Sequence, residues 1–195
     1  TNDFILPYPD LLLLSDSSGR FSDASANIDD QNNGNGKICG FSHDASTGDF
    51  DNDGDYDLFA CNLLLVNDGV GNFVIHEDLD FSLQQAYGNP MSSLIVDLNN
   101  DDYDDLVFWN FDNRPNSIPE EGFALVSDGT AIINNWTLVE LPEGPFGRNH
   151  NKFNHAAWGD LNNDGNNDVV VGITRDLPYY EGAYVQVLIG DGNGN

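Results

Sequence analysis

A nine-residue acidic loop occurs three times in this chain and limits the folds that it can adopt. The first copy is Asp49-Phe50-Asp51-Asn52-Asp53-Gly54-Asp55-Tyr56-Asp57, with acidic side chains at alternate positions and glycine at position six. The other copies begin at Asp97 and Asp160, and we refer to the three as loop 49, loop 97 and loop 160. Each copy leads directly into an apolar run, Leu58-Phe59-Ala60 in the first, which is typical of a β-strand that follows a tight turn.

The side chains of these loops are suited to a hard cation. Calcium takes six to eight oxygen ligands at about 2.3–2.6 Å, and the loops offer oxygen atoms at alternate positions. Position six favours glycine, because a positive φ there folds the chain back around the ion. Position seven would supply its backbone carbonyl as a ligand. Without a cation, carboxylates packed this closely would repel one another and hold the loop open.

The spacing therefore predicts about three calcium sites, one in each loop. In loop 97, Asp102 replaces the glycine of position six. Aspartate enters the left-handed region at a cost of roughly 1–2 kcal/mol, so we expect loop 97 to bind calcium more weakly than the others. The predicted ligands, through a side chain or a backbone carbonyl, are Asp49, Asp51, Asp53, Asp55 and Asp57; Asp97, Asn99, Asp101, Tyr103 and Asp105; and Asp160, Asn162, Asp164, Asn166 and Asp168.

The charge of the chain excludes several classes of partner. Its 195 residues include 33 acidic and only 6 basic side chains, which gives a net charge of −27. Such a chain lacks the cations that neutralise phosphates, which argues against nucleic acids and anionic membranes as partners. No apolar run approaches the length of a membrane-spanning helix, so membrane insertion is not expected. A hydrophobic content of 39% is enough for one domain with a core.

The predicted metal sites indicate where the protein works. Weak oxygen-ligand loops fill where calcium is near millimolar, which is the extracellular condition. We therefore expect a secreted or cell-surface protein. The chain begins with Thr1 and shows no signal peptide, which indicates a processed or excised piece of a longer protein. Cys39 and Cys61 are the two cysteines, and the sequence leaves open whether they form a disulfide or remain buried thiols.

A second motif, an Asp-Gly turn, alternates with the acidic loops. It is clearest at Asp68-Gly69-Val70-Gly71-Asn72-Phe73, and related turns occur at residues 16–21, 128–130 and 191–194. Such glycine-rich turns supply the positive φ values of β-hairpins. The last three turns along the chain follow apolar segments that we predict to be strands, at Leu63–Val66, Phe123–Val126 and Tyr184–Ile189. No segment has a convincing amphipathic helical pattern.

Repeats of this length, each with several short strands, are typical of β-propeller blades. The acidic loops begin at residues 49, 97 and 160, which are 48 and 63 residues apart, and repeats of about 40–60 residues are expected for blades of several short strands. We expect an all-β fold of about three to four blades, comprising a partial blade at 1–39, a blade at 40–88, a blade with an insertion at 89–152 and a partial blade at 153–195. Because propellers typically close with four or more blades, either the polypeptide continues or another chain completes the ring.

Other calcium folds fit this spacing less well. An EF-hand requires a bidentate Glu at position twelve, where this chain has Ala60, Phe108 and Val171. Dockerin-type loops lie in helices and occur as close pairs, whereas strand-like residues flank these loops. With their Asp-Gly turns, the segments instead resemble FG-GAP or VCBS repeats, at Asp49–Ala60, Asp97–Phe108 and Asp160–Gly172.

That resemblance implies a calcium-binding β-propeller like that of integrin α subunits and many bacterial surface proteins. The segments His43–Asp49 and His155–Asp160 resemble the strand that enters the loop in the bacterial members. The resemblance covers nearly the whole chain and is specific for the fold. It indicates function poorly, since propellers serve both binding and catalysis.

Few residues suggest chemistry beyond metal binding. His43 and His155 are either bases or ligands at the mouth of a central channel or polar residues that open an inner strand. We favour the second interpretation, because no Ser, Cys or Glu has a suggestive position beside them. All three tryptophans could stack on sugar rings, but Trp109 and Trp158 lie in predicted strands beside the acidic loops and are expected in the core, unlike Trp136.

The expected function is therefore an extracellular, calcium-stabilised module for cell adhesion or for recognition of a protein or glycan, with calcium in a structural role. One alternative is a structural subunit of a surface layer or filament, in which copies of the chain complete one another's propeller. Another is a part of a polysaccharide-cleaving enzyme, because lyases of propeller fold exist. The expected partners are accordingly a protein or glycan ligand or further copies of the chain.

Overall fold

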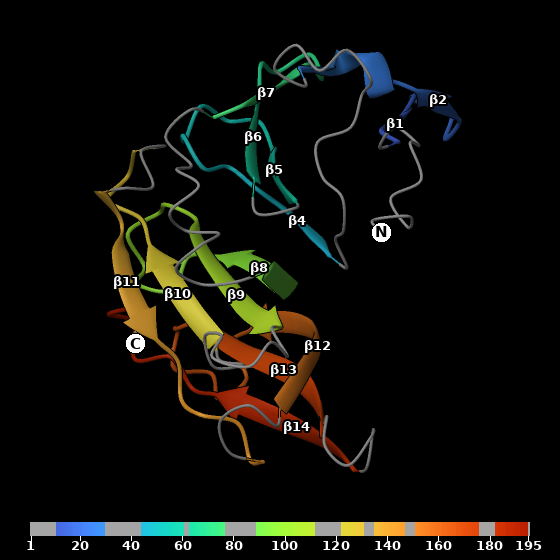
Figure 1. Ribbon diagram of the computed structural model, residues 1–195. Coiled ribbons are helices and arrows are strands. Elements are labelled where there is room, and N and C mark those ends of the chain that lie inside the picture. The colour runs from blue at the N-terminus through green and yellow to red at the C-terminus, as the bar shows by residue number, and fades with distance from the viewer. Residues whose placement is uncertain are drawn as a thin grey trace.

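The structure is a computed structural model, which describes residues 11–29, 44–60, 63–76, 89–111, 122–130, 135–146, 151–175 and 182–194. These residues form β-strands, turns and one short 3-10 helix, so the all-β expectation is confirmed. Within these ranges no helix is long and apolar enough to cross a membrane. Figure 1 shows the strands gathered into separate sheets that follow one another along the chain.

The N-terminal strands form two of the four sheets. A hairpin of β1 (Leu13–Ser15) and β2 (Phe21–Asp23) is followed by the 3-10 helix η1 (Ser25–Asn27). The next sheet, which we call the β4–β7 sheet, has the strand order β3-β7-β6-β5-β4, with only the β3–β7 pair parallel. Its strands are β3 (Ile28–Asp29), β4 (Ala45–Gly48), β5 (Asp57–Ala60), β6 (Leu63–Asn67) and β7 (Phe73–Ile75).

The other two sheets are antiparallel meanders, in which each strand pairs with the next one in the chain. The β8–β11 sheet consists of β8 (Asn89–Val96), β9 (Asp105–Phe111), β10 (Gly122–Val126) and β11 (Thr137–Glu140). The β12–β14 sheet consists of β12 (Asn151–Gly159), β13 (Asp168–Arg175) and β14 (Ala183–Leu188). The strands predicted at Leu63–Val66, Phe123–Val126 and Tyr184–Ile189 are therefore confirmed as β6, β10 and β14.

The β8–β11 sheet lies between the β4–β7 and β12–β14 sheets (Figure 1). Alternate residues of a strand point to opposite faces of a sheet. Strand β10 is buried on both of these faces. Phe123 and Leu125 pack in one hydrophobic cluster, whereas Ala124 packs in another. The β4–β7 and β8–β11 sheets also meet through β4 and β8, where the Ser46 and Ser93 hydroxyls are hydrogen-bonded at 2.5 Å.

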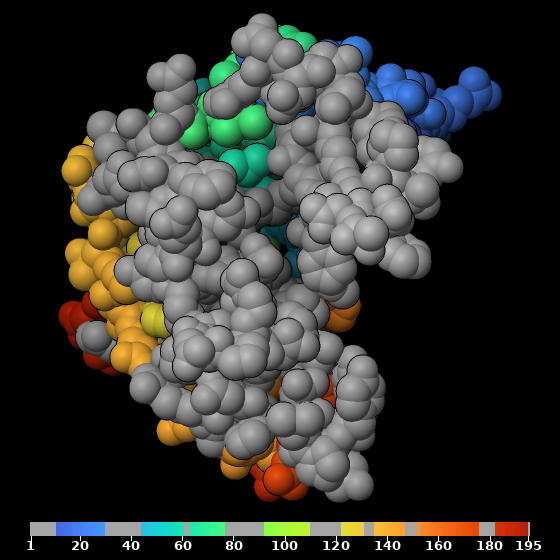
Figure 2. Space-filling view, in the orientation of Figure 1, coloured from blue at the N-terminus to red at the C-terminus, as the bar shows by residue number. Residues whose placement is uncertain are grey.

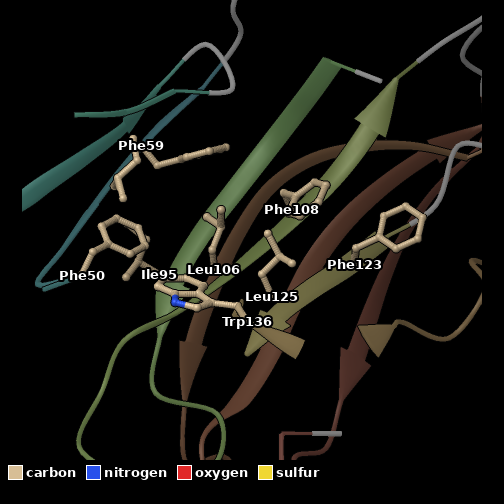
Figure 3. Packing of buried hydrophobic residues seen from close by; sticks show 9 residues of the cluster. Phe50, Phe59, Ile95, Leu106, Phe108, Phe123, Leu125 and Trp136 are labelled. Carbon is tan, nitrogen blue, oxygen red and sulfur yellow. The ribbon is translucent and has the colours of Figure 1, made fainter. Parts of the chain in front are cut away.

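The first hydrophobic cluster joins the β4–β7 sheet to the β8–β11 sheet (Figure 3). Phe50, at position two of loop 49, stacks on Trp136 with the ring centroids 5.7 Å apart. Figure 3 shows Phe50 and Phe59 approaching this cluster from the β4–β7 side. The buried members are Phe50, Phe59, Leu64, Ile95, Leu106, Phe108, Phe123, Leu125 and Trp136.

The second cluster joins the β8–β11 sheet to the β12–β14 sheet. Trp109 stacks on Phe153 with the centroids 5.9 Å apart, and Leu98, at position two of loop 97, packs against the cluster. Leu161 occupies position two of loop 160 and is 52% exposed. Position two therefore contributes an apolar side chain to a hydrophobic cluster in the two loops that are followed by another sheet. The buried members are Val96, Val107, Trp109, Ala124, Phe153, Val169, Val171 and Ile173.

The three tryptophans differ from one another in burial. Trp109 is in the core as expected, whereas Trp158 is 53% exposed, so its predicted burial is wrong. Trp158 is the penultimate residue of β12, which is an edge strand of its sheet, and it is not a member of the second cluster. Trp136 is buried and donates its indole N–H to the Thr130 carbonyl at 2.6 Å, so it does not offer a ring face to a sugar.

The sheets at the two ends of the series have apolar side chains in contact with solvent. Figure 2 shows the residues of β1 and β2 projecting at one end of the molecule. On the β12–β14 sheet, Val185 and Val187 of β14 are exposed, whereas Val171 and Ile173 of the adjacent strand face the second cluster. The β12–β14 sheet therefore buries one face and leaves apolar residues of β14 accessible.

Candidate metal centre

Each acidic loop connects the first two antiparallel strands of a sheet. Loop 49 lies between β4 and β5, loop 97 between β8 and β9, and loop 160 between β12 and β13. The flanking strands are antiparallel and directly paired, so the loops are hairpin connections as the sequence predicted. Their shared spacing gives them the same internal hydrogen bonds, which can be described position by position.

The carboxylate of position one holds the loop in a tight turn. Its two oxygens accept hydrogen bonds from the backbone N–H groups of positions five and six. In loop 49, Asp49 accepts from Asp53 and Gly54, both at 3.0 Å. In loop 97 the corresponding distances to Asp97 are 3.3 and 3.0 Å, and in loop 160 those to Asp160 are 3.1 and 3.0 Å. This carboxylate therefore orders the backbone around the centre of the loop.

Two residues of every loop have a positive φ. At position six the angle is 97° for Gly54, 68° for Asp102 and 91° for Gly165, so Asp102 keeps the loop conformation without glycine. Position four is also left-handed, with φ of 56° to 60° at Asn52, Asn100 and Asn163. This second left-handed position was not predicted from the sequence. The signal was the asparagine found there in all three copies, since Asn tolerates this region better than most residues.

The aspartate of position nine joins three segments of each repeat. One oxygen accepts the N–H of position two, and the other accepts the N–H of the residue just before the Asp-Gly turn. Asp57 accepts from Phe50 at 2.9 Å and from Asn67 at 2.8 Å. Asp105 accepts from Leu98 and Ser127, and Asp168 from Leu161 and Gly190, at 2.7–2.9 Å. All three carboxylates are fully buried, so they are structural residues as well as candidate ligands.

The Asp-Gly turns lie against position seven of the acidic loops. A Cβ added at Gly69 would be 2.8 Å from Asp55 Oδ2, and one at Gly129 would be 2.7 Å from the Tyr103 ring. In the third repeat, a Cβ at Gly192 would overlap the side-chain oxygen of Asn166. The glycine of each Asp-Gly turn is therefore needed for the close approach of the turn to position seven, as well as for the conformation of the turn. The Tyr103 ring packs on the turn, which leaves its backbone carbonyl as the group available to an ion.

Loop 49 brings three carboxylates together. Asp49, Asp51 and Asp57 each offer an oxygen, and these oxygens lie within 4.8 Å of one another. One oxygen of Asp51 and one of Asp55 are shielded from solvent, and among the described residues neither meets a hydrogen-bond donor. Buried polar atoms normally have a partner, which can be a bound ion. The side chain of Asp53 is exposed and accepts the Asp55 N–H at 3.1 Å.

Loops 97 and 160 carry an amide at position three and are less crowded with charge. Asn99 donates its side-chain N–H to Asp101 at 2.8 Å, and Asn162 donates to Asp164 at 2.9 Å. In both loops the amide oxygen accepts the N–H of position five. These bonds partly satisfy position five without a cation. Of the three loops, loop 49 therefore has the greatest concentration of unpartnered negative charge.

The electrostatics of loop 49 favour uptake of positive charge. Burial is the main cause that raises the pKa of Asp51, and the neighbouring Asp53 carboxylate raises it further. Burial and the same carboxylate also raise the pKa of Asp55. Burial raises the pKa of Asp57 to about 6, although the two N–H donors oppose the shift. Because the carboxyl groups of Asp51, Asp55 and Asp57 resist ionisation, a cation that balanced their charge would stabilise the loop.

The same effect occurs in loop 97. Burial raises the pKa of Asp105 to about 6 against the opposing hydrogen bonds from Leu98 and Ser127. Burial also raises the pKa of Asp104, at position eight, although the Asp49 N–H that it accepts opposes the shift. The partly buried Asp104 and the buried Asp105 are thus adjacent in sequence but bond to different segments.

Several other candidates of the sequence analysis are placed differently or lie outside the described ranges. His155 is exposed on β12, in a strand that enters loop 160. Cys39, Cys61 and His43 lie outside the described residues. A scan against models of protein families and a search of curated proteins each found no match. The geometry of the loops therefore carries the functional argument by itself.

Proposed function

We propose that the three acidic loops bind calcium, and that the ions stabilise the sheets that the loops connect. The observation that carries this proposal is the group of carboxylates in loop 49, where buried oxygens of Asp51 and Asp55 lack a donor among the described residues. A bound cation would give these oxygens a partner and would offset the repulsion between carboxylates.

The donor set favours calcium over other metals. The loops offer carboxylate, amide and backbone oxygens, and their nine positions contain neither Cys nor His, which are the ligands that zinc prefers. Magnesium demands near-octahedral geometry and retains several waters, whereas calcium accepts many oxygens in a flexible arrangement. In loop 49 the ion would be held by oxygens of Asp49, Asp51, Asp53, Asp55 and Asp57, and it would supply positive charge.

The ions would act through the position-nine aspartates. Asp57, Asp105 and Asp168 each bond to the start of the loop and to the end of the third strand. An ion that binds such a carboxylate also holds three strands of the sheet together. At a calcium concentration of 100 times Kd, each site would add about 2.7 kcal/mol, so three sites would add about 8 kcal/mol, which is comparable to the 5–15 kcal/mol that stabilises a typical domain.

The sheets and loops support a wider proposal, that the chain is part of an FG-GAP- or VCBS-like β-propeller. Successive meanders pack face to face, and each begins with an acidic loop after its first strand. We propose that this propeller is an extracellular module for adhesion or for recognition of a protein or glycan. The strongly acidic composition and the need for abundant calcium support the extracellular setting.

A second candidate function is that of a structural subunit in a surface layer or filament. The observation that favours it is the row of exposed apolar side chains on β14, which includes Val185 and Val187. An exposed apolar face of this kind invites packing against another sheet. Sedimentation of the calcium-bound chain over a range of concentrations tests this candidate, which requires a mass above that of the 21.4 kDa monomer.

Thermal unfolding in calcium and in chelator tests the calcium proposal. We expect the midpoint to rise substantially in millimolar calcium and to change little in the same concentration of magnesium. Calorimetric titration of the chelator-treated chain should give about three calcium ions per chain, one for each loop. Identical midpoints in calcium and chelator, with no heat of binding, would contradict the proposal.

A further inference from the structure

Neighbouring acidic loops are hydrogen-bonded to each other through position eight. Asp104, at position eight of loop 97, accepts the Asp49 N–H with its Oδ2 at 2.8 Å. Asn167, at position eight of loop 160, donates its side-chain N–H to the Asp97 carbonyl at 2.7 Å. In both cases a side chain from one loop reaches the backbone of position one in the preceding loop. The chemistry differs, since Asp104 is an acceptor and Asn167 is a donor.

Other contacts make these junctions tight. A second bond joins loops 97 and 160, from the Asn100 amide to the Asn166 amide oxygen at 2.8 Å. At the first junction, a Cβ added to Gly48 would overlap Ile95 and lie 2.7 Å from Asp104 Oδ2. Position eight of loop 49 is Tyr56, which is 71% exposed, and the described residues contain no acidic loop ahead of it. The position-eight contact is thus present where two described loops are neighbours.

Position one is the residue whose placement matters most to a loop. Its carboxylate orders the turn by accepting the N–H groups of positions five and six, and it is a predicted ligand of the same loop. A bond to its backbone therefore limits where that carboxylate can lie. Because the bond comes from the next loop, the neighbour helps to set the geometry of the site.

We infer that Asp104 and Asn167 are positioning residues for the calcium site of the loop that precedes their own. This inference rests on the calcium function proposed above. An ion in loop 97 orders Asp104 and thereby prepares loop 49, and an ion in loop 160 prepares loop 97 through Asn167. Since binding free energies are reciprocal, each ion also favours its neighbour in the opposite direction. The three sites then behave as a coupled series rather than as independent loops.

Calcium titration of the complete chain, followed by backbone amide resonances, tests the inference. The amides of Gly54, Asp102 and Gly165 each bond to a position-one carboxylate, so each reports on one loop. Coupling energies between sites commonly correspond to a factor of 5 or more in affinity, so we expect Asp104→Ala to weaken loop 49 by about 5-fold. Loop 160 is bonded to loop 97 but not to Asp104, so it provides the internal comparison and should lose less affinity than loop 49.

Conservative variants separate positioning from charge. Asp104→Asn removes the charge but retains an oxygen that can accept the Asp49 N–H, so loop 49 should remain near its original affinity. Asn167→Asp is nearly isosteric but places a carboxylate against the Asp97 carbonyl, so loop 97 should be weakened directly. Loop 49, which this change reaches only through loop 97, should lose less affinity. The Asn167→Asp variant, compared at loops 97 and 49, also keeps the test decisive if Asp104→Ala does not fold.

The outcomes are distinct. A loss confined to the loop that carries the substitution would overturn the positioning role, as would equal effects of Asp104→Ala and Asp104→Asn on loop 49. Either result would leave calcium binding itself intact. If none of the three amides of the unmodified chain responds to millimolar calcium, both the calcium function and the coupling are wrong.

Discussion

Replacement of Asp57 by Asn separates the contribution of its carboxylate to calcium binding from its contribution to the free energy of unfolding. Asp57 is fully buried and accepts two backbone N–H groups, from Phe50 and Asn67, on separate oxygens. Asparagine has one acceptor oxygen, so its NH₂ group would face one of these donors. An unsatisfied buried donor costs about 1–3 kcal/mol. In chelator, this cost is partly offset because the variant no longer buries a charge at neutral pH.

The size of that offset follows from the pKa of Asp57. Burial raises it from 3.8 to about 6, which corresponds to about 3 kcal/mol at most. The donor cost and this offset nearly cancel, so the net loss in chelator should be about 1 kcal/mol or less. In calcium at 100 times Kd, loss of the site in loop 49 adds about 2.7 kcal/mol, which gives a total between about 3 and 4 kcal/mol.

Urea unfolding at pH 7.4, followed by tryptophan fluorescence, measures both values, because Trp109 and Trp136 are buried in the two cores. The control is Asp102→Asn, which removes one charge from an exposed position that asparagine also tolerates. If Asp57→Asn loses the same free energy in calcium as in chelator, Asp57 is not a ligand. If it matches the control in both solutions, the two hydrogen bonds do not hold the sheet.

Three further predictions concern loop strain, sheet packing and pH. Asp102→Gly should tighten calcium binding in loop 97 and stabilise the chain by about 1 kcal/mol, as calorimetry and urea unfolding can measure, because glycine adopts φ of 68° without strain. Gly48→Ala should cost about 1–3 kcal/mol in urea unfolding, because its Cβ would overlap Ile95, whereas Gly159→Ala at the equivalent position is open and should change little. Burial raises the pKa of Asp57 and Asp105 to about 6, so the folded chain binds protons more tightly than the unfolded chain. Urea unfolding should therefore show the calcium-free chain gaining stability from pH 7.5 to 4.5, on the order of 1 kcal/mol per carboxyl, and the calcium-loaded chain losing stability because protons compete with the ion.

The sequence was sufficient to predict what depends on local spacing. Acidic side chains at alternate positions, glycine at position six and the apolar runs beyond them correctly placed the hairpin loops and strands such as β6 and β10. Such features depend on a few consecutive residues, whose allowed backbone angles and burial pattern can be inferred directly. The left-handed asparagine of position four was equally local and could have been predicted from its recurrence.

Features that depend on how the sheets stack could not be predicted. Asp104 and Asn167 are ordinary turn residues in the sequence, and their bonds to Asp49 and Asp97 arise because separate sheets bring the loops together. The same limit explains the wrong expectation for Trp158. Ala156 and Ala157 precede it in the strand, but the burial of a given residue depends on whether a neighbouring sheet reaches it.

The double contact of the position-nine aspartate has a consequence for strand alignment. Asp105 meets its two donors only when β9 and β10 pair as Leu106 with Leu125 and the loop has closed. A slip of one residue would shift the donor by about 3.3 Å and turn side chains to the wrong face. A misaligned hairpin would then present an incomplete cage to the ion. Calcium would bind the correctly aligned chain more tightly than a misaligned one, and would thus shift the folding equilibrium toward the correct register by mass action.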